Sequence, residues 1–189
     1  LSPDGGMVAR HNKGFRVQVF DVASGSIHHV GPQIPYPGGV GWSPDGRWLT
    51  LRSFRDFQEG NTRRELWLIS PETGDAETVD HDRADVGYWM TLEPSWSPDA
   101  SSFAYVRGEP GQPHMCNLEL CVFRLHDRKA VRLTTSSAHP QWSPTTGRIA
   151  FSRSSERRPA DRLWLINADG TNERKLTMGD RASGDVNPA

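Results

Sequence analysis

One short turn motif recurs four times along the chain and constrains its fold more than any other feature. Ser-Pro-Asp-Gly begins at Ser2 and Ser43, Ser-Pro-Asp-Ala at Ser97, and Ser-Pro-Thr-Thr-Gly at Ser143. The intervals of 41, 54 and 46 residues are typical of stacked supersecondary units. The sequence therefore predicts a single module, residues 1–189, whose repeats cover about residues 1–42, 43–96, 97–142 and 143–189.

Each repeat contains short apolar runs bounded by turn residues. The clearest runs are residues 17–20, 66–69, 120–123 and 163–166. Runs of this length, rich in β-branched and aromatic side chains, are typical of strands and not of helices. Asp169-Gly170, which follows the last of these runs, is a strong hairpin signal. Four antiparallel strands per repeat predict an all-β fold, a β-propeller with four four-stranded blades in this chain.

The tryptophans and aspartates of the motif have structural explanations. Trp42, Trp96 and Trp142 occupy one repeat position, which favours packing between blades over a sugar-binding platform. The Asp of Ser-Pro-Asp-Gly is expected to bond the backbone of its own turn, while Pro presets φ at the second position. We therefore expect no metal coordination by Asp4, Asp45 or Asp99.

The phase of the repeats leaves two ring architectures open. The first repeat lacks a Pro-x-Trp strand of its own, and residues 184–189 stop where the next one would lie. In one architecture, four blades close with residues 184–189 beside residues 6–10. In the other, the four blades are part of a larger ring, completed by self-association or by further residues.

Composition and motifs exclude several function classes. The 22 basic and 23 acidic residues give a net charge of −1, so no overall charge attracts nucleic acid or an anionic membrane. No apolar run approaches the roughly 20 residues that span a bilayer. The seven histidines show no metal-binding spacing. The chain contains no Gly-x-Ser-x-Gly elbow, phosphate-binding loop, Cys-x-x-Cys pair or His-Glu-x-x-His motif, so we expect no catalytic residues, metal or cofactor.

The two cysteines leave the redox compartment open. In one continuous strand, Cys116 and Cys121 would lie about 16 Å apart and point to opposite faces. They form a disulfide only if Cys116 lies in the preceding loop and folds back. The alternative is two unpaired thiols, with Cys121 half buried.

The irregular loops favour one side of the propeller for binding. The short turns lie on one side, and the long loops, residues 30–38, 53–64, 80–91, 107–117 and 152–161, lie on the other. Variable loops on a rigid scaffold usually carry the binding function. The candidate ligand-binding residues on this side are Arg55, Arg64, His81, Asp82, Tyr88, Trp89, Arg157 and Arg158.

These candidates have two interpretations. The arginines are suited to carboxylate or phosphate, and Tyr88 and Trp89 to the rim of the central channel. The alternative is a solvated charged surface, since Glu59 and Glu65 lie among the arginines, with the two aromatic rings packed on the third blade.

The motifs resemble a known repeat family. Trp-Ser-Pro-Asp-Gly before a strand, Leu-Trp-Leu-Ile-Asn-Ala-Asp-Gly at residues 163–170 and Arg-Lys-Leu-Thr at residues 174–177 look like the TolB-type propeller repeat, a relative of the WD repeat. Residues 142–177 match best, and the resemblance covers the whole chain. It implies a ring of six to eight blades and a periplasmic or extracellular location.

The resemblance implies three classes of function. The first is a non-catalytic scaffold that binds a protein or peptide through the variable loops. The second is the non-catalytic propeller domain of a prolyl oligopeptidase-like hydrolase or of a lyase. The third is a module that binds carbohydrate or a small anion at the channel mouth, through residues such as Trp89 and Arg157. The same repeat serves all three, so fold alone does not choose among them.

Overall fold

The computed structural model describes residues 1–55, 62–84, 94–108, 118–135, 137–155 and 158–177. Its regular elements are strands. They are, in chain order, β1 (Met7–His11), β2 (Val17–Asp21), β3 (Ile27–Val30), β4 (Pro37–Trp42), β5 (Leu49–Arg55), β6 (Thr62–Ile69), β7 (Ala76–Ala84), β8 (Ser95–Trp96), β9 (Ser102–Gly108), β10 (Leu118–Arg124), β11 (Lys129–Thr134), β12 (Ala138–Trp142), β13 (Arg148–Ser155), β14 (Arg158–Asn167) and β15 (Arg174–Lys175). None of the described segments is a helix that could cross a membrane.

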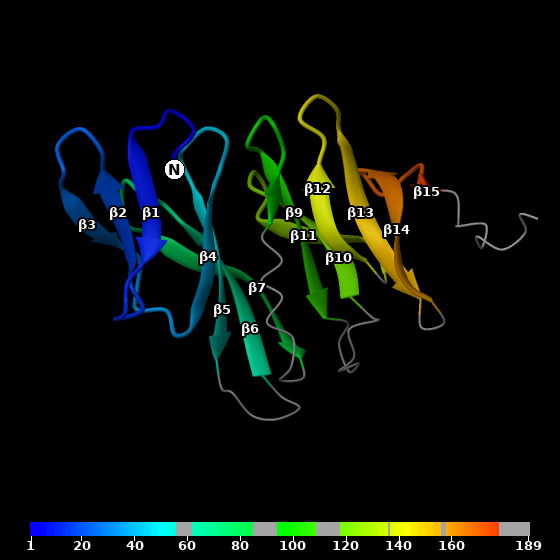
Figure 1. Cartoon of the computed structure of the whole chain (residues 1–189), viewed down its shortest axis with the longest axis horizontal. Helices are drawn as coiled ribbons and strands as arrows, with labels where there is room; N and C mark the ends of the chain where they lie inside the picture. The colour runs from blue at the N-terminus through cyan, green and yellow to red at the C-terminus, as the bar shows by residue number, and fades with distance from the viewer. Residues whose placement is uncertain (56–61, 85–93, 109–117, 136, 156–157, 178–189) are drawn as a thin grey trace, which may run out of the picture.

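The strands form four antiparallel sheets, which confirms the predicted all-β propeller architecture. The orders are β1-β2-β3, β4-β5-β6-β7, β8-β9-β10-β11 and β12-β13-β14-β15. Figure 1 shows the sheets side by side in chain order, with the first and last at opposite ends. The described sheets thus form an open arc. Residues 184–189, proposed as a fourth strand beside β1, lie outside the described residues.

The sheets are offset from the sequence repeats by one strand. The strand that ends in the motif tryptophan pairs with the strand after the turn, because a tight turn joins antiparallel neighbours. Trp42 pairs with Leu49, Trp96 with Phe103 and Trp142 with Ile149. The strand that ends in the motif tryptophan is therefore the first strand of its blade.

Several strands extend into segments predicted to be loops. β5 continues to Arg55, β7 to Ala84 and β9 to Gly108, and β14 already begins at Arg158. The apolar pattern marks only the buried part of each strand, whereas ladder hydrogen bonds use backbone groups that polar residues also have. The prediction that residues 37–38, 53–55, 62–64, 80–84, 107–108, 152–155 and 158–161 belong to loops was wrong.

The Ser-Pro-Asp-Gly turn has the geometry predicted for it. Ser43 Oγ donates to Asp45 Oδ1 at 2.5 Å and accepts from the backbone N–H of Trp48 at 2.9 Å. The N–H of Arg47 also donates to Asp45 Oδ1, at 3.1 Å. The first and third repeats repeat these contacts. The motif aspartate therefore bonds its own turn, as predicted.

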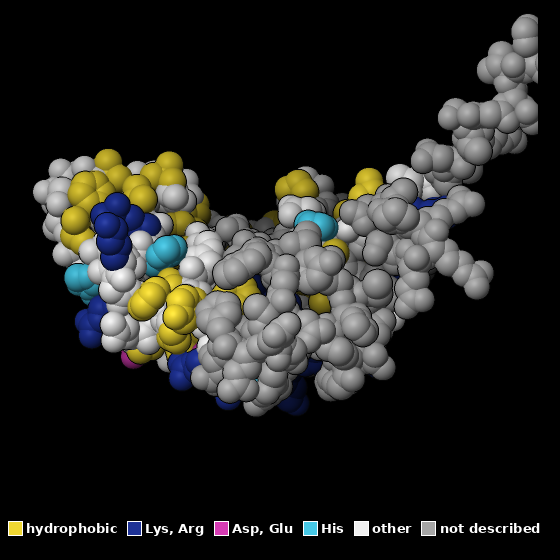
Figure 2. All heavy atoms as spheres, turned by 60° about the horizontal axis from the view of Figure 1, so that its bottom comes forward, with side chains coloured by type: hydrophobic (Ala, Val, Ile, Leu, Met, Phe, Trp, Pro, Cys, Tyr) yellow, Lys and Arg dark blue, Asp and Glu magenta, His cyan; other side chains and the backbone are white. Residues whose placement is uncertain are grey.

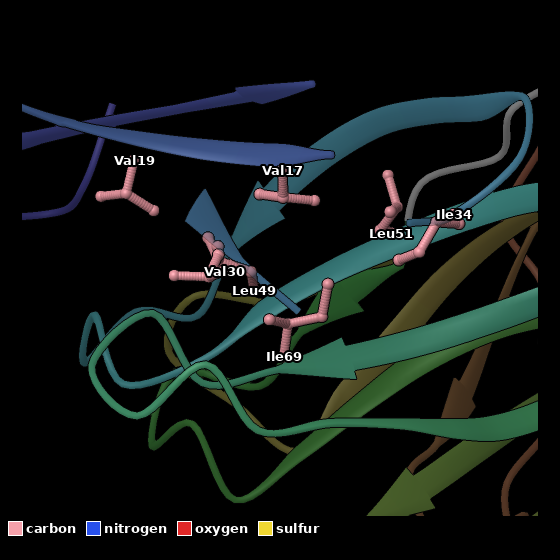
Figure 3. Close-up of a cluster of buried hydrophobic side chains, with 7 residues drawn as sticks. All are labelled: Val17, Val19, Val30, Ile34, Leu49, Leu51 and Ile69. Atoms are coloured by element: carbon pink, nitrogen blue, oxygen red, sulfur yellow. The ribbon is translucent and has the colours of Figure 1, made fainter. Parts of the chain in front are cut away.

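Among the described residues, the hydrophobic core is divided into three clusters, each shared by two neighbouring sheets. Figure 3 shows the first, in which Val17 and Val19 of the first sheet meet Leu49 and Leu51 of the second. The second and third sheets share Leu68 and Phe103, among others, and the third and fourth share Val122 and Ile149. Trp42, Trp96 and Trp142 each pack against one cluster, which confirms their role between blades.

Cys121 lies within the cluster between the second and third sheets. It is fully buried and free, so the expectation of a half-buried side chain was wrong and Cys121 forms no disulfide. Burial raises the pKa of its thiol to about 12. Cys116 lies outside the described residues.

Candidate binding site

Charged side chains gather where the second and third sheets approach the variable loops. We call this group the loop-end arginine cluster. Its members are Arg52 and Arg55 of β5, Arg63, Arg64 and Glu65 of β6, Asp80 and His81 of β7, Tyr105 and Arg107 of β9, Glu119 of β10 and Arg132 of β11. Strand register gathers them, since Glu65 pairs with His81, Leu66 with Asp80, and Arg107 with Glu119.

Glu119 is the most buried acid of the cluster and is held by two arginines. Its side chain is 3% exposed; Oε2 accepts from Arg107 Nε at 2.7 Å, and Oε1 from Arg132 Nη1 at 2.9 Å. Burial alone would raise the pKa of Glu119, but the hydrogen bonds from the two guanidinium groups lower it below its usual value. Glu119 is therefore ionised at neutral pH and fixes both arginines in place.

Asp80 connects the second sheet to the third. Its Oδ2 accepts a hydrogen bond from the hydroxyl of Tyr105 and one from Arg107 Nη1 at 3.3 Å. Arg52 of the second sheet donates to the backbone carbonyl of Val106 in the third. Burial, together with the negative charge of Asp80, raises the pKa of Tyr105 above its usual range, so the phenol stays protonated and acts as a donor. The cluster thus joins the second and third sheets by hydrogen bonds.

Glu65 organises the arginines nearest the loops. Its side chain is 5% exposed and lies 3.4 Å from Arg55 Nε through Oε2 and 3.2 Å from Arg63 Nε through Oε1. The side chains of Arg55 and Arg63 are 43% and 37% exposed. Each of the two arginine side chains therefore forms an ion pair with a buried acid and is also partly exposed to solvent.

The space enclosed by the cluster is too small for an organic cofactor. A pocket lined by Arg52, Arg64, Asp80, Tyr105 and their neighbours has a volume of about 10 Å³, which is close to the minimum for one water molecule. Within the described part of the chain, no three His, Cys, Asp or Glu side chains are grouped to hold a metal ion. Any ligand of this site therefore binds on its surface.

The cluster carries a surplus of positive charge. Its described side chains include six guanidinium groups, of Arg52, Arg55, Arg63, Arg64, Arg107 and Arg132, against the three carboxylates of Glu65, Asp80 and Glu119. Figure 2 turns the loop side forward and shows Lys and Arg side chains at several places on it, with almost no Asp or Glu visible among the described atoms. The arrangement can receive carboxylate or phosphate groups by charge-assisted hydrogen bonds.

The structure brings together three of the predicted site residues. Arg64 and His81 line the small pocket, and Arg55 joins them through Glu65. Asp82 is the direct cross-strand partner of Arg64 in the backbone register, although its side chain is outside the described part. Arg158 begins β14 in the fourth sheet, and its side chain is likewise outside. Tyr88, Trp89 and Arg157 lie outside the described residues altogether.

Sequence reasoning missed most of the buried members of the cluster. Tyr105 lies inside the apolar run 103–106, whereas Arg52 and Glu119 lie just outside the runs 48–51 and 120–123. None of the three was predicted as a site residue. A signal was present in the sequence, because Arg52 and Glu119 are charged residues directly beside apolar runs. Both are buried in the structure, and a buried charge is almost always paired. Their partners lie in other strands, however, so the pairing follows only from the register.

The chain has the fold of TolB-type propellers, as its motifs predicted. A TolB from Agrobacterium tumefaciens superposes with a TM-score of 0.61 at 20% identity, over 94% of this chain and 60% of that one. TolB from Acinetobacter baumannii gives 0.60 at 19% identity, over 92% and 41%. An acylaminoacyl peptidase from Pyrococcus horikoshii gives 0.64 at 13% identity, over 93% and 31%. The chain thus spans less than two thirds of each of these proteins. No family model matches the sequence.

Proposed function

We propose that this chain is a non-catalytic β-propeller scaffold that binds a protein or peptide partner through its variable-loop side, in the periplasm or outside the cell. The observation that carries the proposal is the loop-end arginine cluster, which is positively charged and held by buried acids. The partner segment it fits is acidic, because side-chain carboxylates accept the paired N–H donors of arginine. Self-association that completes a larger ring stays a separate prediction, checked by the sedimenting mass.

The exposed arginines support binding as well as structure. The ion pair of Arg55 is made through Nε, and a guanidinium carries five N–H donors, so one carboxylate does not use its full capacity. Buried Glu65 keeps the side chain in place, which lowers the entropy lost when a partner binds. This is the arrangement of a preorganised site rather than of freely moving surface charges.

Isothermal titration with a capped hexaglutamate peptide tests the proposal. We expect binding that weakens as salt is raised, because the contacts are electrostatic, and no binding of capped hexalysine. The double variant Arg55→Ala/Arg64→Ala should weaken binding at least fivefold. Lys129→Ala, which removes a charge on the short-turn side, is the matched control and should leave the affinity unchanged. Equal binding by the double variant would show that the assignment to this side is wrong.

A second candidate is the propeller domain of a larger hydrolase. It is favoured by the structural similarity to the Pyrococcus horikoshii acylaminoacyl peptidase, of which this chain covers 31%. Reading the coding sequence on both sides for a Gly-x-Ser-x-Gly elbow distinguishes this candidate from the scaffold. An adjoining α/β domain with that motif would support it.

A further inference from the structure

An open groove lies between the third and fourth sheets on the short-turn side, opposite the loop-end arginine cluster. It has a volume of about 550 Å³, which is within the usual range of ligand pockets. Val122 and Trp142 contribute its apolar surface, and the Ser-Pro turns of the two sheets, with Pro98 and Pro144, form part of its walls. We call it the turn-side groove.

The groove is open because the repeat places a small residue at one position. In the first three repeats, the backbone N–H of the motif serine donates to the carbonyl of Met7, Trp48 or Ser102, which are therefore equivalent. Met7 and Trp48 pack against the clusters on either side of the second sheet. Ser102 lines the groove instead, so the volume filled by an indole at one interface is empty at the next.

A second side chain is also missing at this interface. Trp48 is covered by Arg128 of the third sheet, whose guanidinium carbon lies 5.3 Å from the ring centroid and which pairs with Glu77. Arg128 adopts a left-handed conformation in its hairpin turn, with φ 53°. The equivalent residue of the fourth sheet is Gly170, with φ 87°. The counterparts of Trp48 and Arg128 at the interface between the third and fourth sheets are thus Ser102 and Gly170, which carry neither an aromatic ring nor a charge.

The walls of the groove favour a cation. Asp99 and Asp169 both line it, and hydrogen bonds, foremost from the Ser97 hydroxyl to Asp99 and from the Thr171 hydroxyl to Asp169, lower the pKa of both carboxyls. Arg124 lines it as well, but its Nη2 pairs with Asp127 at 2.8 Å. The groove thus combines apolar surface with two ionised carboxylates and one guanidinium that already pairs with Asp127.

From this comparison between interfaces we infer that the turn-side groove binds a peptide segment in which an aromatic residue adjoins an arginine or lysine. The aromatic ring would occupy the space that Trp48 fills one interface earlier, against Val122 and Trp142. The neighbouring cation would lie near Asp99 and Asp169. The chain thus carries, in Trp48 and Arg128, an internal copy of the ligand that the groove takes.

Calorimetric titration of the 189-residue chain with acetyl-Gly-Arg-Trp-Gly-amide tests this inference. We expect one-to-one binding, and at least fivefold weaker binding when Glu replaces Arg or Ala replaces Trp in the peptide. Ser102→Trp should weaken binding at least tenfold, because it fills the groove with the side chain that the preceding repeat already tolerates. Asp169→Asn should weaken it about threefold, whereas Asp75→Asn, in the hairpin turn of the second sheet, is the matched control and should not.

Two results of this titration would overturn the inference. No heat of binding at millimolar peptide, or unchanged affinity in Ser102→Trp, would overturn the inference. Should Ser102→Trp fail to fold, as judged by circular dichroism, Asp169→Asn decides, and unchanged affinity in that variant would also overturn it. The hexaglutamate experiment concerns the opposite side of the molecule, so either proposal can fail without the other.

Discussion

Replacing Ser97 by alanine tests whether the motif turn is a source of stability or only a connection. Ser97 is 3% exposed. Its Oγ donates to Asp99 Oδ1 at 2.6 Å and accepts from the N–H of Ser102 at 3.0 Å. Alanine would leave that N–H without its side-chain acceptor and the carboxylate without its shortest donor. The substitution removes no apolar volume, so its effect comes from hydrogen bonding alone.

The expected magnitude follows from these two bonds. A neutral hydrogen bond contributes about 1 kcal/mol, and one to a charged group about 1.5 to 3 kcal/mol. We therefore expect Ser97→Ala to lower the free energy of unfolding by about 2.5 kcal/mol. For a chain of 150 to 250 residues, this corresponds to a fall in Tm of roughly 5 to 10 °C. Ser143→Ala is the matched control, because that turn has Thr145 in place of Asp and Ser143 Oγ accepts only from the Thr145 and Thr146 N–H groups, at 3.4 and 3.2 Å.

Urea unfolding followed by circular dichroism at several pH values measures the effect. The pKa of Asp99 is lowered in the folded state, first by the Ser97 hydroxyl. Its contribution to stability is therefore present above the unfolded pKa of about 3.9 and is lost as pH falls through the folded value. The difference between wild type and Ser97→Ala should shrink in acid. Equal destabilisation by Ser97→Ala and Ser143→Ala at pH 7, or a difference that does not change with pH, would refute the reasoning.

Three further substitutions or treatments have expected outcomes. Glu119→Gln should lower the free energy of unfolding by about 3 kcal/mol in urea titrations, since it leaves two arginines without their buried acid; a loss below 1 kcal/mol would contradict the structural role of the cluster. Gly46→Ala should lower the Tm because φ is +71° there, whereas Gly147→Ala, at a position with no positive φ and open space for a Cβ, should not. In a Cys116→Ser variant, the thiol of Cys121, with its pKa raised to about 12, should resist an aromatic disulfide reagent at pH 8 until urea unfolds the chain; rapid labelling of this variant in native buffer would contradict the burial of Cys121.

The repeated turns and the tryptophan positions were predictable because each is a local signal. Asp45 forms hydrogen bonds with residues within two positions of itself. Trp42 directly precedes its turn in the sequence. Both roles can therefore be predicted without knowing the strand register. The same locality explains why the fold class could be predicted from four copies of one motif. Repetition made each weak signal support the others.

The candidate site was predictable only in part. Arg64 and His81 were identified because they lie near long irregular segments, and they do line the small pocket. Tyr105 and Asp80 meet across two sheets at a sequence separation of 25 residues, and this contact depends on how the blades pack. The lengths of β5 and β7 were underestimated for a related reason, since polar strand ends carry no apolar pattern.

The division of the core between sheets limits how such a chain can evolve. Each apolar cluster contains side chains from two adjacent sheets. Deleting half a repeat would therefore expose the apolar side chains of the remaining sheet to solvent. Growth or loss by whole blades keeps every interface complete, and insertions are tolerated chiefly where strands turn back at the arginine-rich end. Related propellers should therefore differ in chain length by multiples of one repeat. Their loops should vary in length mainly on the side of the loop-end arginine cluster.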